Sequence, residues 1–244
     1  MTRTLRAAWR LLGGVLHCLH GVAIVLTRFD ALDAAQRRAR IQWWANKMLR
    51  TMGIALRVDG TPHAGGTLLI ANHISWLDIM AVHAVCPQAR FVSKADVKAW
   101  PVLSKLVDAA GTLYLERERK RDALRVVHVM AQALSAGEMV AVFPEGTTSD
   151  GRALLPFHAN LLQAAIATDT PVQPVALRFS DTYDAVSRAV EFVGATTLVQ
   201  SLWRVAGGED VVVHVRLLPP LPTHGADRRV LSDQVRAQIA AALV

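Results

Sequence analysis

A histidine and an aspartate five residues apart carry the first chemical signal in this sequence. They are His73 and Asp78 in the stretch ANHISWLD, residues 71–78, which lies between two apolar runs. Residues five apart diverge by about 140° on a continuous helix, so the two side chains meet only if His73 lies in a loop before the first turn. In that geometry the carboxylate orients one imidazole nitrogen and leaves the other free as a general base.

Asp78 also has a purely structural interpretation. Ser75 is expected to cap the helix that follows, which makes Ser75-x-x-Asp78 a capping box. This pattern accounts for Asp78 and leaves His73 unexplained. No serine or cysteine stands in a sharp strand-to-helix elbow, so the pair would activate a hydroxyl that the substrate supplies.

A second turn rich in polar groups follows the apolar run MVAV. It is FPEGTTSDG, residues 143–151. Proline and glycine at a strand end ordinarily form a tight turn. Backbone N–H groups and threonine hydroxyls beside a glycine also bind oxyanions and polar headgroups. Taken alone, this turn is a weak functional signal.

The two motifs together resemble the glycerolipid acyltransferase family, which makes phosphatidic acid from lysophosphatidic acid. The matching residues are NHxxxxD at 72–78 and FPEGT at 143–147. Further stretches resemble other blocks of the family: FVSKADVKAWP at 91–101 with its Lys94, GTLYLER at 111–117 with its Arg117, and VQPVAL at 172–177 around Pro174. The resemblance covers about residues 50–180.

This resemblance implies acyl transfer from an acyl thioester to the hydroxyl of a lysolipid. His73 would be the general base and Asp78 would orient it. The donor would be acyl-coenzyme A or an acyl-carrier protein, and no metal, cofactor or covalent acyl-enzyme is required. The substrate-binding residues carried over from the motifs are Asn72, Lys94, Arg117, Glu145, Gly146, Thr147 and Thr148.

Two positions depart from the family pattern. Glu116 replaces the usual aspartate, and Thr148 stands where many members have an arginine. The Thr148 change removes a candidate phosphate-binding cation. FPEGTTSDG looks more like the variant of bacterial relatives that acylate lyso-ornithine lipid. The acceptor therefore stays open between 1-acyl-sn-glycerol-3-phosphate, which the motifs place first, and lyso-ornithine lipid.

Two interpretations compete with this enzyme. His73, Asp78 and His83 have an H-x4-D-x4-H spacing that invites a metal site, but helical ligand pairs prefer i, i+3 or i+4 and His83 lies in an apolar run. The other competitor is a catalytically inactive, membrane-bound lipid-binding adaptor. The presence of both motifs together argues against it.

The body that must position these residues, 53–244, alternates strands and helices. Strands are expected at 54–60, 67–71, 90–94, 111–117, 139–143, 172–177 and 210–218, and helical stripes at 124–134, 161–166 and 227–243. The segment around Gly207 and Gly208 is expected to be a loop. The pattern predicts an α/β fold with a mixed, partly parallel central sheet flanked by helices. In such sheets functional groups gather where strands end.

Residues 1–52 are predicted to form a membrane-associated helical hairpin. The run at 11–26 is apolar but shorter than a bilayer span, so whether residues 9–28 span or dip is left open. A second helix is expected from near Asp30. Its apolar stripe faces lipid, the protein's own core, or both; the stripe is Ile41, Trp44, Ala45, Met48 and Met52.

The charge distribution and the cysteine content indicate where in the cell the protein works. Residues 1–50 hold nine basic and two acidic side chains, which account for the whole net charge of +7, and 52% of all residues are apolar. Basic residues mixed with tryptophans fit an anionic membrane surface, expected to be the cytoplasmic face of the inner membrane. No nucleic-acid motif accompanies the charge. Two cysteines indicate a reducing compartment, and nothing in the sequence indicates an oligomeric state.

Overall fold

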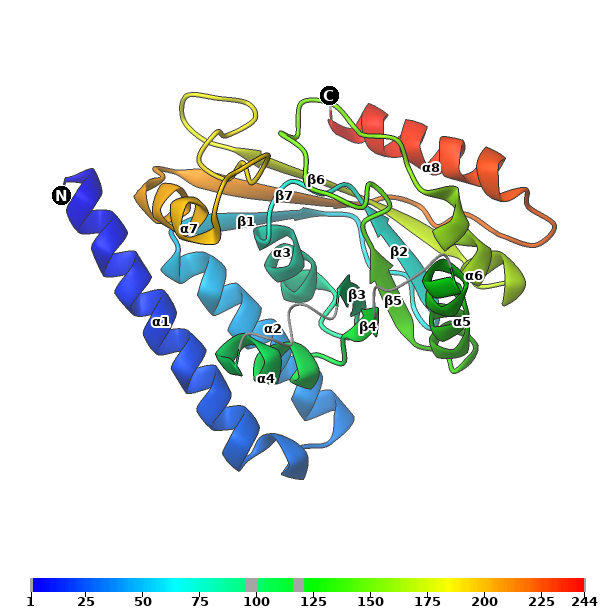
Figure 1. Ribbon diagram of the computed structural model, residues 1–244, viewed down its shortest axis with the longest axis horizontal. Coiled ribbons are helices and arrows are strands. Elements are labelled where there is room, and N and C mark those ends of the chain that lie inside the picture. Colours follow the sequence, from blue (N-terminus) through cyan, green and yellow to red (C-terminus); the bar gives the residue numbers. More distant parts are fainter. Residues whose placement is uncertain (1, 95–100, 116–120, 244) are drawn as a thin grey trace.

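A seven-stranded sheet forms the centre of the protein (Figure 1). The computed structural model describes residues 2–94, 101–115 and 121–243. The strand order is β1-β7-β6-β2-β5-β3-β4, and every neighbouring pair is parallel except β6 with β7. The strands are β1 (Ile54–Asp59), β2 (Thr67–Ala71), β3 (Arg90–Lys94), β4 (Leu113–Leu115), β5 (Met139–Val142), β6 (Val172–Ser180) and β7 (Val211–Leu217). All seven predicted strands are confirmed, and the sheet is mostly parallel.

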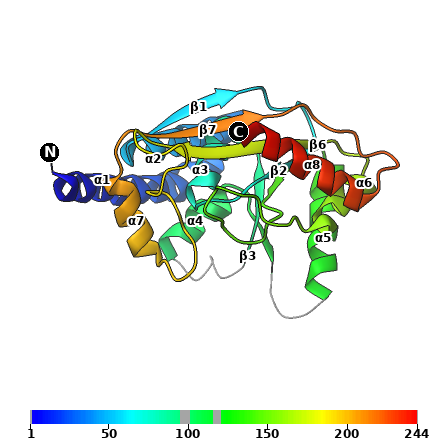
Figure 2. The ribbon, with the colours of Figure 1, turned by 90° about the horizontal axis from the view of Figure 1, so that it is seen from above.

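Helices cover both faces of this sheet, as the two views show (Figures 1 and 2). The helices are α1 (Arg3–Thr27), α2 (Ala34–Thr51), α3 (Leu77–Val85), α4 (Pro101–Ala109), α5 (Arg121–Ser135), α6 (Gln163–Ala167), α7 (Leu198–Gly207) and α8 (Arg228–Leu243), with short 3-10 turns at Phe29–Ala31 and Ala159–Leu162. The α/β fold is therefore confirmed.

The central strand β2 shows why two helical layers are needed. All five of its residues are buried. Because side chains alternate along a strand, Leu69 and Ala71 join the core beneath α2, α3 and α7, whereas Leu68 and Ile70 join the core beneath α5, α6 and α8. A strand buried on both faces reads as a continuous apolar run, which is typical of a parallel sheet.

The N-terminal hairpin is present, with one correction to its bounds. The second helix begins three residues later than expected, because Asp33 and Gln36 form a reciprocal capping box ahead of Ala34. The stripe of α2 faces the protein's own core: Ala45, Met48 and Met52 are buried there. The expected division between residues 52 and 53 falls between α2 and β1.

The expectation of a loop around Gly207 and Gly208 was wrong. Gly207 is the last residue of α7, which begins after Thr197. Thr197 and Gln200 form a capping box, a T-x-x-Q signal that the sequence does contain. Helix α4, which packs against α1, was also not predicted.

Candidate active site

The sheet register brings the two motif turns together. β2 and β5 are parallel neighbours, and Ile70 lies opposite Val142. Three residues further along each strand, this register places His73 beside Glu145. The contact is direct, because the backbone N–H of His73 donates to the Glu145 carboxylate at 2.8 Å. The backbone N–H of Ser149 in turn donates to the His73 carbonyl at 2.8 Å, which closes the junction of the two loops.

His73 and Asp78 meet as the spacing predicted. The Nδ1 atom of His73 lies 2.7 Å from Asp78 Oδ2. His73 stands in the loop before α3, and Asp78 is in the first turn of that helix. Asp78 is fully buried, while 19% of the His73 side chain is exposed. With a proton on Nδ1 held by the carboxylate, Nε2 is the nitrogen available to a substrate.

Only half of the capping box predicted for Ser75 and Asp78 is present: the Asp78 carboxylate accepts the Ser75 backbone N–H, but the Ser75 hydroxyl caps nothing. Trp76 occupies the N-cap position and makes no side-chain cap bond, and the Ser75 hydroxyl is buried without a hydrogen-bond partner. Asp78 Oδ2 instead accepts the backbone N–H groups of Ile74 at 2.6 Å and Ser75 at 2.8 Å. The carboxylate reaches back over the loop because that loop has donors with no other acceptor.

Two phenylalanines extend the site beyond the motif residues. The Phe143 ring is stacked on the His73 ring with centroids 4.0 Å apart and an interplanar angle of 7°. Phe91 lies against Phe143 at 5.5 Å. Sequence reasoning missed both roles, although each residue stands in or directly after a predicted strand of the same sheet. The Phe143 ring covers one face of the imidazole, and Phe91 packs against Phe143.

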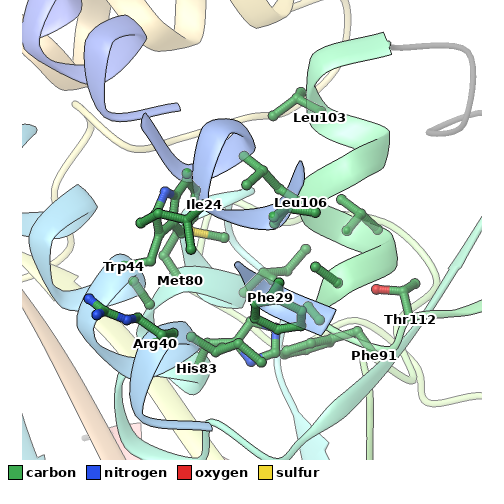
Figure 3. Close-up of a pocket in the computed structure, with 18 of the residues that line it drawn as sticks. Ile24, Phe29, Arg40, Trp44, Met80, His83, Phe91, Leu103, Leu106 and Thr112 are labelled. Carbon is green, nitrogen blue, oxygen red and sulfur yellow. The ribbon is translucent and has the colours of Figure 1, made fainter. Parts of the chain in front are cut away.

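Phe91 also lines an apolar cavity of about 170 Å³ (Figure 3). The cavity is lined mainly by α1, α2, α3 and α4, and Figure 3 shows Ile24, Phe29, Trp44 and Leu106 among its walls. The N-terminal hairpin and the α/β body therefore both contribute to the lining of this cavity. The stacked rings of Phe91 and Phe143 connect it to His73.

Glu145 is buried and both its oxygens are engaged. Oε1 accepts the His73 N–H and Oε2 accepts the Leu155 N–H at 2.9 Å. Burial raises the pKa of this carboxyl, and the two backbone donors oppose that rise. The structure thus gives Glu145 a bridging position between two loops, and its predicted contact with the headgroup stays a prediction.

The rest of the FPEGTT turn divides into exposed and anchored residues. Gly146 has φ +69°, and a Cβ there would lie 3.1 Å from the His158 ring, so only glycine fits without strain. Gly146 and Thr147 are exposed beside the site. Thr148, in contrast, donates its hydroxyl to the carbonyl of Phe192. Its side chain is therefore occupied within the protein.

The remaining predicted binding residues are placed as follows. Asn72 is fully buried, and its amide exchanges two hydrogen bonds with the backbone of Leu177, at 2.9 and 2.8 Å. This pairing ties the end of β2 to β6. Lys94 ends β3, and its side chain lies outside the described part of the structure, as does the whole of Arg117. Substrate contacts of all three stay predictions.

His83 takes no part in a metal cluster in the structure. It is buried in α3, with its ring edge-on to Phe91 at 5.1 Å. Burial lowers the pKa of His83 to about 4. Within the described residues, no group of three histidine, cysteine or acidic side chains is arranged to hold a metal ion.

The sequence containing this site matches a known family. Residues 55–178, which contain both motif turns, match the Acyltransferase family. The chain belongs to this family.

Curated relatives of this acyltransferase match over most of their length. A lyso-ornithine lipid O-acyltransferase of Pseudomonas aeruginosa is 36% identical over 88% of this chain and 83% of its own. A 1-acyl-sn-glycerol-3-phosphate acyltransferase of Neisseria meningitidis is 36% identical over 80% and 76%, respectively. The fold matches the crystal structure of the 1-acyl-sn-glycerophosphate acyltransferase PlsC from Thermotoga maritima, with a TM-score of 0.68 at 20% identity and 96% coverage of both chains.

Proposed function

We propose that this acyltransferase moves a fatty acyl chain from a thioester to the hydroxyl of a membrane lysolipid. The observation that carries the proposal is the His73–Asp78 pair, with one imidazole nitrogen held at 2.7 Å by a fully buried carboxylate. A base with no protein nucleophile in its motif acts on a hydroxyl brought by the substrate. Lysolipids supply such a hydroxyl.

In the proposed mechanism, Nε2 of His73 accepts the proton of the lysolipid hydroxyl as its oxygen attacks the thioester carbonyl. Asp78 holds the imidazole in the correct tautomer and stabilises the imidazolium. When the tetrahedral intermediate collapses, the carbon–sulfur bond breaks and the thiolate takes the proton from His73. The products are the diacyl lipid and the free thiol of coenzyme A or of an acyl-carrier protein.

The apolar cavity is the proposed site for the acyl chain. Its walls are almost entirely hydrocarbon, and the Phe91–Phe143 stack leads from it to His73. Burial of an alkyl chain there contributes about 0.8 kcal/mol per methylene. Because α1 and α2 form one side of the cavity, a chain held there lies next to the helix assigned to the membrane.

For the acceptor, the Thr148 contact favours lyso-ornithine lipid over 1-acyl-sn-glycerol-3-phosphate. Thr148 replaces a potential cation and is turned toward Phe192. The next basic residue, Arg152, is paired with Glu191 at 2.5 Å and Asp150 at 3.5 Å. A phosphate acceptor needs strong cationic partners, so this turn suits a headgroup that carries its own positive charge. The Neisseria relative keeps 1-acyl-sn-glycerol-3-phosphate as the second candidate.

Membrane attachment is assigned to α1. It is long and apolar enough to cross a bilayer by length and composition, and large apolar side chains line its exposed face. Because acyl-coenzyme A and acyl-carrier protein are cytoplasmic donors, we place the enzyme on the cytoplasmic face of the inner membrane.

The test is acyl transfer by purified enzyme with both lysolipids and both donors, assayed side by side. We expect transfer to lyso-ornithine lipid with the higher kcat/KM. His73→Ala should lower kcat by about 10²–10⁴-fold, and Asp78→Asn should lower it with little change in KM.

Each outcome discriminates between functions. Transfer that survives in His73→Ala would refute the base mechanism. A preference for 1-acyl-sn-glycerol-3-phosphate would reverse the acceptor assignment. Wild-type protein that binds lysolipid but transfers no acyl chain would support the inactive adaptor.

A further inference from the structure

The connection between β6 and β7 contacts both motif loops. We call residues 181–207 the connecting segment; it consists of a loop followed by α7. It lies outside the region matched by the Acyltransferase family, which ends at residue 178. It is nevertheless well packed, since Ser187, Val190 and Ser201 are fully buried. A segment packed in this way can hold other parts of the site in place.

The loop of the connecting segment contacts the second motif loop. The Thr148 hydroxyl donates to the Phe192 carbonyl. Four residues along the same motif loop, Arg152 forms an ion pair with Glu191 at 2.5 Å. Between them, Gly151 has φ +75°, and a Cβ added there would lie 3.3 Å from Val186 and 2.9 Å from Ile74. The second motif loop is thus sandwiched between the connecting segment and the first motif.

Helix α7 of the connecting segment contacts the first motif loop. The indole N–H of Trp76 donates to the Ser201 hydroxyl of α7 at 3.1 Å. Trp76 is the N-cap residue of α3, three residues after His73 and two before Asp78. A shift of α7 would therefore move the short loop on which the base and its carboxylate are aligned.

The far end of α7 is fixed to the membrane helix. Arg6 donates to the Gly207 carbonyl at 3.0 Å, and Arg10 donates to the carbonyls of Ala206 at 3.2 Å and Gly208 at 2.7 Å. These are the carbonyls left without partners at a helix C-terminus, where a guanidinium is also favoured by the helix dipole. The connecting segment therefore joins α1 to both motif loops.

From these contacts we infer that Thr148 and Ser201 are positioning residues, through which the connecting segment holds the two motif loops in catalytic alignment. This inference rests on the proposed acyl transfer. It gives Thr148 a role other than headgroup contact: its hydroxyl is a tether. Alignment matters because a misplacement of about 1 Å at a reacting group costs up to about 10²-fold in rate.

The experiment compares matched variants at each tether. Thr148→Val removes the hydroxyl at nearly constant shape, and Thr148→Ser keeps it. We expect kcat to fall about tenfold in Thr148→Val, with KM for donor and acceptor and the melting temperature close to wild type. Thr148→Ser should restore kcat to within about twofold.

A double-mutant cycle tests the second tether. Ser201→Ala and Trp76→Phe each remove one partner of the same bond, so each should lower kcat and the double variant should fall no further.

Wild-type enzyme without acyl transfer would defeat the proposed function itself. An active wild type with equal kcat in Thr148→Val and Thr148→Ser would overturn the tether. A Thr148→Val variant in which only the KM for the acceptor rises would also overturn the tether, because that result would make Thr148 a headgroup contact.

Discussion

At the scale of single residues, one carboxylate oxygen organises the catalytic loop. Asp78 Oδ2 accepts from His73 Nδ1 and from the backbone N–H groups of Ile74 and Ser75. The same oxygen therefore shapes the loop and orients the imidazole that we propose as the base. This double use explains how a loop without a capping side chain keeps His73 in one position.

Protonation of the buried His83 makes the free energy of unfolding depend on pH. Its folded pKa of about 4 is lower than the value of about 6.5 for an exposed histidine, because burial disfavours the charged form. The neutral state is thus the one that folding favours. Its contribution is fully present above pH 6.5 and is lost as the pH falls toward 4, up to about 3 kcal/mol.

His83→Leu should therefore flatten the fall in melting temperature between pH 6.5 and pH 4, measured in detergent micelles. His224→Gln is the control, because His224 is exposed and lies 3.2 Å from Asp169. An unchanged acid profile in His83→Leu would show that other groups cause the acid sensitivity.

Spacing predicted the His73–Asp78 contact because both residues lie within one local turn, where helical geometry fixes what can meet. The partners of Thr148 and Asn72 could not be predicted in this way. Phe192 and Leu177 are 44 and 105 residues away, and only the sheet order and the connecting segment bring them close. The Ser75 capping box forms only on the Asp78 side, where the same carboxylate oxygen also binds the Ile74 N–H and His73 Nδ1.

At the scale of elements, small residues let α1 lie close to the body. Ala7, Gly14 and Gly21 recur every seven residues on its buried face. Gly14 leaves room for a methyl group, since a Cβ would lie 3.6 Å from Met52 Sδ. Gly21 leaves none, because a Cβ would lie 2.4 Å from Trp44 Nε1 and 2.9 Å from Leu106 Cδ2.

These two glycines make a matched test of helix packing. Gly14→Ala should be neutral or stabilise by up to about 1 kcal/mol, the difference in helix propensity. Gly21→Ala should destabilise by about 1–3 kcal/mol through overpacking. Thermal unfolding in micelles measures both. Equal effects of the two substitutions would show that α1 does not pack as described.

The seven strands could be predicted because each is a short apolar run between turn residues. Helix α7 was missed for a physical reason: its last residue, Gly207, is followed by Gly208, and glycines disfavour helix locally, but arginines of α1 supply the partners that its last carbonyls need. Tertiary contacts thus extend the helix further than local propensity alone would.

Helix α4 contributes Leu106 to the cavity wall (Figure 3), so its side chain should set which acyl chains fit. Leu106→Trp fills the cavity and should shift donor preference to shorter chains. Leu106→Ala enlarges it and should favour longer ones. The measurement is kcat/KM over a series of acyl thioesters; a parallel loss for all chain lengths in both variants would place the acyl chain elsewhere.

At the scale of the whole molecule, much of the basic charge of residues 1–50 is used internally. Arg6 and Arg10 bind α7, and Arg37 donates to the Leu32 carbonyl at 2.9 Å. Arg40 and Lys47 lie against the Trp43 ring, at 5.8 and 5.1 Å. The sequence showed where this charge is concentrated, but only the fold shows that part of it secures α1 to the body.

The exposed face of α1 is an unbroken apolar stripe along the helix: Leu5, Trp9, Leu12, Leu16, Leu19 and Leu26. The opposite face is covered from end to end, by α7 near Arg10 and by α2 and α4 near Gly21. If α1 crossed a bilayer, these helices would enter the hydrocarbon with exposed charges such as Arg204 and Lys105, at a cost of several kcal/mol. We therefore expect α1 to lie in the plane of one leaflet.

Cysteine labelling in cells tests this orientation together with the membrane face. In a variant with Cys18 and Cys86 replaced by alanine, Thr4→Cys and Thr27→Cys place one thiol at either end of α1. If α1 lies in the cytoplasmic leaflet as proposed, both ends are on the cytoplasmic side, so an impermeant maleimide should label neither in intact spheroplasts and both after lysis. Labelling of one position alone in intact spheroplasts would show that α1 crosses the membrane, and labelling of both would place the enzyme on the outer face.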